Sequence, residues 1–243
     1  MSVNPLFQRL SLITGETGLE KLARTKVLVF GAGGVGSWAA EALVRSGIGK
    51  IGIIDSDTVC ASNVNRQAEA TTLTIGHPKA DALKKRLLEI NPDCEVTAWN
   101  ELFCRENAET FGIESADYVI DAIDTVNHKL DLIETVCNAG AALFSSMGMA
   151  LKMDPSQIKI ASIWNTSGCP LARLVRHGLR KRGFSSNFTV VYSDEPEKRA
   201  SFAAYNTALP TPCEKHENGS AVTVTAGAGF LLASLVLRGI TGL

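Results

Sequence analysis

The sequence predicts an α/β protein with a doubly wound, mainly parallel, Rossmann-like sheet and a C-terminal α+β extension. Three observations carry this prediction. A glycine-rich turn joins two apolar runs within residues 26–57, apolar runs alternate with helical patterns up to residue 146, and the pattern changes near residue 151. We expect residues 1–150 to form a core with an N-terminal arm. Residues 151–243 should pack on that core as an extension, giving one structural unit.

The charge of the chain is unevenly distributed. The net charge is −1, but residues 151–243 carry 11 Lys and Arg against 6 Asp and Glu, while residues 1–150 carry 13 against 19. This asymmetry points to a polyanionic partner for the second part, or simply to a solvated surface.

The cysteines are scattered and form no CxxC pair, which argues against a four-cysteine zinc site. With no signal peptide at the start of the chain, we expect free thiols and a cytoplasmic location. The six positions are Cys60, Cys94, Cys104, Cys137, Cys169 and Cys213.

The glycine-rich turn predicts a nucleotide site. An apolar run over residues 27–30 leads into the turn, an amphipathic segment follows, and a second apolar run ends at Asp55. Glycines let the backbone approach a phosphate, helix N-terminal amides point at it, and Asp55 falls where a ribose hydroxyl is received. The glycines are Gly31, Gly33, Gly34 and Gly36.

The polar loop after Asp55 is expected to hold phosphates. Residues 56–72 read as irregular, and they include four amide or guanidinium side chains, Asn63, Asn65, Arg66 and Gln67. A helix from 77 to about 90 follows. Lys79 lies in its first turn, where a cation is unfavourable unless an anion binds nearby.

Asp124 lies at the carboxyl end of a predicted strand. We expect strands over 95–98, 118–122 and 141–146, and helical segments over 107–111 and 126–139. Ligands of open α/β sheets sit beyond the carboxyl ends of strands, so Asp124 is placed to meet a polyphosphate through a metal. The position alone equally fits an N-cap of the next helix.

The second part contains a strongly basic helix between strands predicted at 158–163 and 190–192. One stripe is apolar, through Leu171, Leu174, Val175 and Leu179. The opposite stripe is basic and no acid occurs between Cys169 and Tyr192, which favours contact with a phosphate backbone over a solvated face. The basic residues are Arg173, Arg176, His177, Arg180 and Lys181, with Arg182 beyond them.

The two ends of the chain have helical patterns. Residues 1–25 form an arm with breaks near Gly15 and Gly18, and Arg9 stands on it. The apolar segment 221–237 is short for a bilayer span, which favours a helix buried in the core or at a dimer interface. Peripheral membrane attachment stays open. The polar segment 193–216 is expected to be mobile.

Several of these motifs together resemble the ThiF/MoeB/HesA group of adenylating enzymes, over roughly residues 5–150. The matching motifs are Phe7-x-Arg9, Gly31-Ala-Gly-Gly-Val-Gly36, Asp55-x-Asp57, Asn63-Val-Asn-Arg-Gln67, Lys79 and Asp121-Ala-Ile-Asp124. The resemblance implies ATP rather than NAD, and transfer of AMP to a carboxylate. It implies that Asp55 holds the ribose, Asp124 holds Mg²⁺, and Arg66 and Lys79 contact phosphates. It also implies a homodimer in which Arg9 reaches the other subunit's site.

The second part looks like one branch of that group, the tRNA threonylcarbamoyladenosine dehydratases. The marks are the basic segment after Cys169 and the stretch Val190-Val-Tyr-Ser-Asp-Glu-Pro196. This resemblance implies a ligase-like activation of the threonyl carboxylate of the modified tRNA nucleoside, followed by ring closure. Arg173, Arg176, Arg180, Lys181 and Arg182 would then grip tRNA; DNA is not expected as a partner.

Three other functions remain as alternatives. The first is an activating enzyme for a ubiquitin-like sulfur-carrier protein, with Cys169 or Cys213 as a thioester cysteine, and a sulfur-relay protein is left open as a partner. The others are a nucleotide-binding scaffold and a dinucleotide-binding dehydrogenase. The asparagine-rich loop with Arg66, together with Lys79, speaks against both of these, since a reductase would need a hydride-acceptor pocket that the sequence does not indicate.

Overall fold

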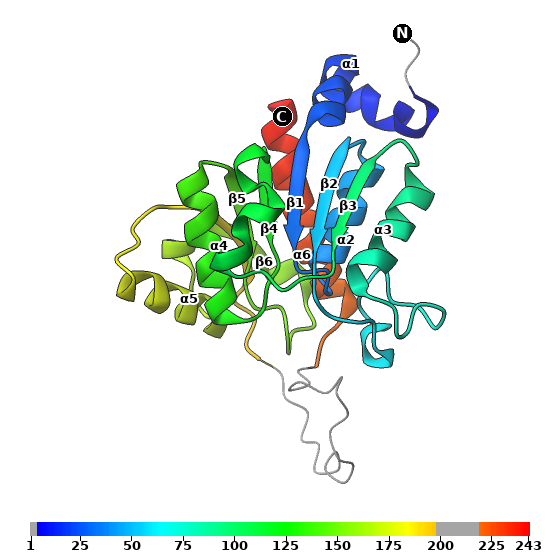
Figure 1. Cartoon of the computed structure of the whole chain (residues 1–243). Helices are drawn as coiled ribbons and strands as arrows, with labels where there is room; N and C mark the ends of the chain where they lie inside the picture. The colour runs from blue at the N-terminus through cyan, green and yellow to red at the C-terminus, as the bar shows by residue number, and fades with distance from the viewer. Residues whose placement is uncertain (1–3, 198–218) are drawn as a thin grey trace.

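The computed structural model describes residues 4–197 and 219–243, and its centre is one seven-stranded sheet (Figure 1). The strand order is β3-β2-β1-β4-β5-β7-β6, and every neighbouring pair is parallel except the antiparallel β6 and β7. The strands are β1 (Lys26–Phe30), β2 (Lys50–Ile54), β3 (Glu95–Trp99), β4 (Tyr118–Asp121), β5 (Ala142–Ser146), β6 (Ile158–Ser162) and β7 (Thr189–Ser193). The predicted doubly wound α/β fold is confirmed.

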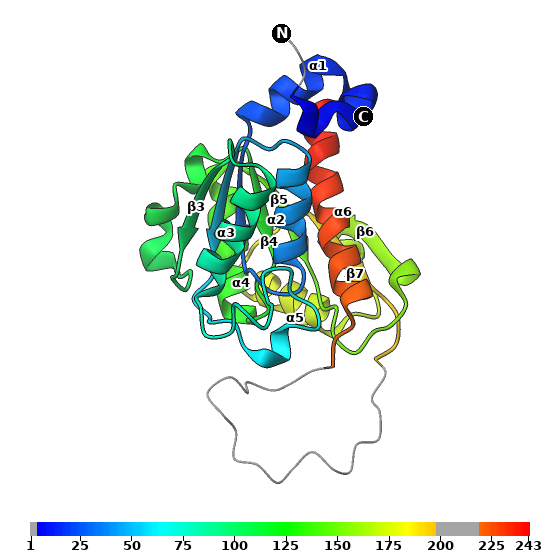
Figure 2. The same ribbon diagram turned by 90° about the vertical axis from the view of Figure 1, so that its right-hand side faces the viewer.

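Helices cover both faces of the sheet. In Figure 2, α3, α2 and α6 lie side by side over one face, and α4 and α5 pack on the other. The helices are α1 (Gln8–Arg24), α2 (Gly36–Arg45), α3 (Lys79–Ile90), α4 (Val126–Ala139), α5 (Pro170–Lys181) and α6 (Val222–Thr241). Short 3₁₀ turns are η1 (Pro5–Phe7), η2 (Ala61–Asn63), η3 (Arg105–Phe111), η4 (Ile113–Ser115), η5 (Pro155–Gln157) and η6 (Ile163–Asn165).

The strand register brings three loops to one end of the sheet. Phe30, the last residue of β1, pairs with Ile54 of β2 and with Asp121 of β4. The turn after β1, the loop after β2 and the connection after β4 therefore leave the sheet at the same level. Helix α5 lies beside this end in Figure 1, whereas α1 lies at the opposite end.

The second part of the chain extends the first sheet directly. Strand β7 pairs with β5 in parallel and with β6 in antiparallel orientation, so the sheet runs without a break across residue 150. Strand β6 ends at Ser162, one residue before the end of the strand predicted there, and Ile163 begins η6. Most of the polar segment 193–216 lies outside the described residues.

Helix α6 packs against α2, the helix that begins at the glycine-rich turn. A Cβ atom at Gly229 of α6 would stand 2.5 Å from the carbonyl oxygen of Val35, so only glycine permits this approach. The ring of Phe230 meets Trp38 edge-on at 5.9 Å. By length and mean hydropathy (1.6) α6 also qualifies as a candidate membrane span. Its buried residues, including Val224, Ala228, Leu232 and Val236, are typical of a core helix.

The cysteines differ in state. Cys94, Cys104, Cys137 and Cys169 are free, and burial raises the pKa of the Cys94 thiol to about 11. Cys60 is disulfide-bonded, so the expectation of free thiols is wrong at that position. Cys213 lies outside the described residues.

Candidate active site

The glycine-rich turn has the predicted strand–turn–helix geometry. Gly31 follows β1 with φ of +93°, and a Cβ there would stand 2.7 Å from the carbonyl oxygen of Ala122. A Cβ at Gly36 would stand 1.8 Å from the carbonyl oxygen of Gly31. Side chains are therefore excluded at both positions, and the backbone amides at the start of α2 are left open to an anion.

The glycine turn lies against the polar loop. A Cβ atom at Gly33 would lie 3.9 Å from the side-chain amide nitrogen of Gln67. A Cβ atom at Gly34 would lie 3.3 Å from the Cγ atom of Arg66. The indole N–H of Trp38 donates to the carbonyl oxygen of Arg66 at 2.9 Å. The structure thus brings together two motifs that the sequence separates by some thirty positions.

The four polar residues of the loop have different environments. Asn63 is buried and accepts a hydrogen bond from the Cys60 amide at 3.0 Å, which closes η2. Arg66 donates to the carbonyl oxygen of Ser62 at 2.7 Å and to Asn65 Oδ1 at 3.1 Å, and Asn65 donates to the carbonyl oxygen of Ser220. Gln67 is buried, and its Oε1 has no partner among the described residues.

Asp55 links the ends of two strands. Its Oδ2 accepts from the Ala32 amide at 2.7 Å and its Oδ1 accepts from the Asp57 amide at 2.8 Å. Burial raises the pKa of Asp55, against the opposing effect of the positive charge on Lys79. The carboxylate therefore lies at the edge of the glycine turn and fixes the amide of Ala32.

Lys79 lies at the start of α3 and points into a group of carboxyl groups. Its side chain is only 8% exposed and pairs with Asp57 at 3.0 Å. Its charge also acts on Asp55 and on Glu69. Lys79 thus lies in the first turn of α3, as the sequence predicted, and its ammonium group is held close to the acids of the site.

Glu69 is a member of this group that sequence reasoning missed. It is 2% exposed, and neither carboxyl oxygen has a hydrogen-bond partner among the described residues. Burial raises its pKa to about 8, against the opposing effect of the positive charge on Lys79. The available signal was an acid between two alanines in a loop that otherwise bears amides and an arginine.

Asp124 is exposed at the end of the connection that follows β4. The N-cap residue of α4 is Thr125, and Asp124 accepts a long bond from the Thr125 hydroxyl, 3.3 Å. The N-cap interpretation of Asp124 is therefore wrong. The carboxylate instead faces solvent at the same end of the sheet as Asp55.

The donor set fits a magnesium ion that is bound together with a polyphosphate. Among residues 4–197 and 219–243, no group of three or more His, Cys, Asp or Glu side chains could hold a metal by itself. Mg²⁺ commonly uses one or two carboxylates plus substrate phosphates. Asp124, an exposed carboxylate at the mouth of the turn, supplies that kind of ligand.

Arg9 is not brought to this site within one chain. It is exposed on α1, at the opposite end of the sheet (Figure 1). Helix α1 has its break at Gly15 (φ +69°), as the glycine pattern predicted.

The basic face of α5 is partly engaged by the protein itself. Arg173, His177 and Lys181 are exposed, and the Arg180 guanidinium lies 5.4 Å above the Trp164 ring. Arg176 donates to the Thr166 hydroxyl. On the other side, Ala172, Val175 and Leu179 are buried, but Leu174 is 51% exposed, so its assignment to the apolar stripe is wrong.

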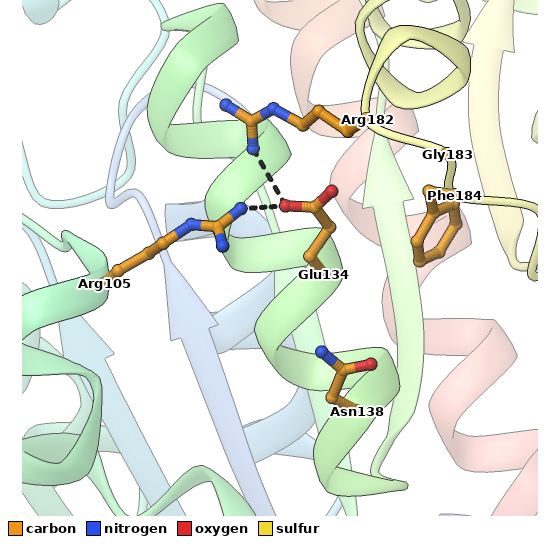
Figure 3. A pocket seen from close by; sticks show the side chains of 6 residues that line it. All are labelled: Arg105, Glu134, Asn138, Arg182, Gly183 and Phe184. Atoms are coloured by element: carbon orange, nitrogen blue, oxygen red, sulfur yellow. Dashed lines mark hydrogen bonds and ion pairs between the residues drawn. The ribbon is translucent and has the colours of Figure 1, made fainter.

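Arg182 belongs to an ion-pair network at the end of α5. Figure 3 shows Arg182 and Arg105 approaching Glu134 from two sides. Both arginines also pair with Asp131, at 2.7 and 2.8 Å. The network lines a pocket of about 530 Å³ with Asn138 and Phe184. The two carboxylates balance the two guanidinium charges, so Arg182 offers less free charge than Arg173.

Comparison with known proteins agrees with this geometry. The family model described as ThiF family matches residues 6–243. A tRNA threonylcarbamoyladenosine dehydratase of Bacillus subtilis is 46% identical over 189 residues, covering 78% of this chain and 74% of the relative. The solved structure of the E. coli tRNA N6-threonylcarbamoyladenosine dehydratase in complex with ATP has a TM-score of 0.88 at 32% identity, covering 100% of this chain and 98% of that one.

A relative named as an adenylyltransferase is more distant. The probable molybdopterin-synthase adenylyltransferase of Porphyra purpurea is 30% identical over 226 residues, which cover 91% of this chain but 53% of the relative.

Proposed function

This chain belongs to the ThiF family, and from that membership we propose that it is an ATP-dependent tRNA threonylcarbamoyladenosine dehydratase. The observation that carries the proposal is the 46% identity to a dehydratase over most of both chains. The site supports it, because the glycine turn, Lys79 and Asp124 provide backbone amides, a cation and a metal-binding carboxylate at one end of the sheet.

In the proposed first step, a carboxylate oxygen of the threonyl group attacks the α-phosphorus of ATP. The bond from the α-phosphorus to the bridging oxygen breaks, and pyrophosphate leaves. The turn from Gly31 to Gly36, with Gly33 and Gly34, receives the phosphates, and Asp55 receives the ribose. Arg66 and Lys79 stabilise the charge that develops on phosphate oxygens. Asn63, Asn65 and Asp57 hold the loop and the lysine in place. Gln67, whose side-chain nitrogen faces Gly33, contributes to the lining of the cofactor site.

Mg²⁺, held by Asp124 and the phosphates, would supply further charge neutralisation at the same oxygens. In the second step an atom of the same modified nucleoside attacks the acyl carbon, and AMP leaves. The sum of the two steps removes one water from the nucleoside, at the expense of ATP. No side-chain nucleophile of the protein is needed.

The basic residues of α5 suit the anticodon arm of a tRNA. Arg173, Arg176, Arg180 and Lys181 lie on a helix beside the end of the sheet that holds the glycine turn (Figure 1). Phosphate contacts of this kind position a nucleic acid without reading its sequence. We propose two functional parts in one folded unit, residues 1–150 for ATP and residues 151–243 for tRNA, in a cytoplasmic protein.

We propose a homodimer whose interface involves α1 and α6. Leu12 and Ile13 of α1 are 79% and 72% exposed, and Phe230 of α6 is 50% exposed. An apolar groove of about 260 Å³ lies between these helices. In such a dimer Arg9 reaches the partner's site. Mixing Arg9→Ala with Asp124→Ala should restore part of the activity that each variant lacks alone, because one mixed site then has both residues.

The test of the main proposal is direct. The protein is incubated with ATP, Mg²⁺ and threonylcarbamoylated tRNA, and the tRNA is digested to nucleosides. The expected product is the cyclic nucleoside, lighter by one water. An unchanged nucleoside, together with pyrophosphate exchange that depends on a carrier protein and ignores tRNA, would instead support the sulfur-carrier alternative. Cys169 is 4% exposed, which makes it a poor thioester cysteine for that alternative.

A further inference from the structure

A fully buried ion pair lies directly behind the connection that carries Asp124. Lys129 of α4 and Asp121 of β4 are both 0% exposed, and Lys129 Nζ lies 2.8 Å from Asp121 Oδ2. The hydroxyl of Ser145 on β5 donates to the same oxygen at 2.6 Å. Three elements thus converge on one carboxylate that the proposed reaction does not use.

The two charged side chains grip one peptide segment from both sides. The amide of Ile123 donates to Asp121 Oδ1 at 3.1 Å. Lys129 Nζ donates to the carbonyl oxygen of Ile123 at 2.7 Å. Both backbone polar groups of Ile123 are therefore fixed by buried side chains, and Asp124 is the next residue.

The gripped segment also forms part of the floor of the glycine turn. The amide of Ala122 donates to the carbonyl oxygen of Phe30 at 2.8 Å. The carbonyl oxygen of Ala122 lies only 2.7 Å from the position that a Cβ atom of Gly31 would take, so Gly31 cannot carry a side chain. A shift of Ile123 would move Asp124 relative to the amides that receive the phosphates.

Stability alone does not explain two buried charges here. Removing a pair of charges from water is costly, and well-packed apolar residues of similar volume are often as stable or more so. The pair does, however, supply what an apolar substitute lacks, an acceptor and a donor at fixed positions for the Ile123 backbone.

We propose that Asp121 and Lys129 are a positioning pair that holds Asp124 where its carboxylate and the ATP phosphates share Mg²⁺. The proposal rests on the proposed function for the role of Asp124. It predicts that disrupting the pair raises the Mg²⁺ concentration needed for half-maximal rate and slows turnover. Binding of the nucleoside half of ATP, which depends on Asp55, is unaffected.

The experiment uses the double variant Asp121→Asn with Lys129→Met, which leaves no unpaired buried charge. The matched control is Lys50→Met with Glu95→Gln, which removes an exposed pair (3.2 Å) between β2 and β3. Thermal unfolding checks that both proteins fold. Hydrogen exchange of the Ile123 amide in the metal-free protein, ATP affinity in EDTA, and the Mg²⁺ dependence of turnover are then measured.

For the double variant we expect exchange at Ile123 and the Mg²⁺ concentration for half-maximal rate each to rise about tenfold, the size of effect that outer-shell partners of metal ligands have. ATP affinity in EDTA should stay within about twofold, as it should in the control. A folded variant with unchanged exchange and unchanged Mg²⁺ dependence would overturn the proposal.

Ser145→Ala is the second variant, in case the double variant does not fold. It removes one bond to Asp121 and leaves the charges paired, so smaller increases of the same two quantities are expected, and their absence counts against the proposal. If the wild-type protein proves unable to dehydrate the tRNA nucleoside, the proposed function fails. Hydrogen exchange at Ile123, which does not depend on activity, still decides the positioning role.

Discussion

Lys79 and Asp57 are joined by both side chain and backbone. Lys79 Nζ lies 3.0 Å from Asp57 Oδ2, and the Lys79 amide donates to the Asp57 carbonyl oxygen at 2.9 Å. The backbone bond fixes the start of α3 on the loop after β2. The side-chain pair holds the ammonium at the end of the sheet where the glycine turn lies. In the proposed function, this fixed ammonium contacts a phosphate of ATP.

Replacing Lys79 should therefore weaken the use of ATP. We expect Lys79→Met to raise the KM for ATP about 10- to 100-fold, the range for loss of a hydrogen bond to a charged group. Lys85→Met, an exposed lysine on the same helix, is the control and should leave KM unchanged. Steady-state kinetics with varied ATP measure both. Equal KM values for the two variants would contradict a phosphate contact by Lys79.

Replacing Asp124 should reduce turnover rather than folding. Its side chain is exposed and makes a long contact of 3.3 Å with the Thr125 hydroxyl. The Tm of Asp124→Ala should therefore equal that of the wild-type protein. We expect kcat to fall on the order of a hundredfold or more, because charge stabilisation of the transition state is lost. Asp124→Glu with raised Mg²⁺ should recover part of the rate. A variant with wild-type kcat would remove Asp124 from the mechanism.

Glu69 should make stability depend on pH. Its pKa is about 8 in the folded protein and 4.5 ordinarily, so between these values the unfolded chain loses a proton that the folded chain keeps. Folding stability should then decrease as pH rises from 5 to 8, by at most about 1.4 kcal/mol per pH unit from this group. Below pH 4.5 both states are protonated and the penalty disappears.

The variant Glu69→Gln removes this titration, so its stability relative to the wild type should increase between pH 5 and pH 8. Urea unfolding at the two pH values measures the difference. Glu89→Gln, at an exposed position of α3, is the control. A stability difference for Glu69→Gln that is the same at both pH values would show that the carboxyl group is already ionised at pH 5.

The arginines of α5 should contribute unequally to tRNA binding. Arg173 is exposed, so Arg173→Ala should weaken binding and reduce the slope of log K against log salt by about one unit. Arg176→Ala should act in the same direction. Arg182 already pairs with Asp131 and Glu134, so Arg182→Ala should change the slope less. Binding isotherms at several salt concentrations distinguish these cases, and a larger effect at Arg182 would be inconsistent with a tRNA surface centred on Arg173.

Local patterns were sufficient to predict that the glycine-rich turn and the acids after β2 and β4 meet at one end of the sheet. The glycine spacing of residues 31–36 and the acids after β2 and β4 depend on one strand and its next turn, and parallel strands then bring these ends together. Glu69 and the Lys129–Asp121 pair could not be found in this way. Their burial depends on packing between elements that are distant in sequence.

The same limit applies to the second half. The position of β7 between β5 and β6 is a non-local pairing, so the sequence predicted an extension rather than a continuation of the sheet. Leu174 lies at the edge of the apolar stripe of α5, where the 3.6-residue period of a helix does not determine whether a side chain is buried. Arg182 finds its carboxylates on a helix some fifty residues earlier.

The contact between Gly229 and Val35 has a consequence for the order in which the protein matures on the ribosome. Strand β1 and helix α2 are synthesised early, but the surface of α2 that includes Val35 and Trp38 packs against residues 222–241, which are synthesised last. Until those residues have emerged and docked, a nascent chain exposes this apolar surface to chaperones and proteases. The glycine-rich turn is therefore synthesised early, but the helix that follows it reaches its full packing only after the C-terminal helix has been synthesised.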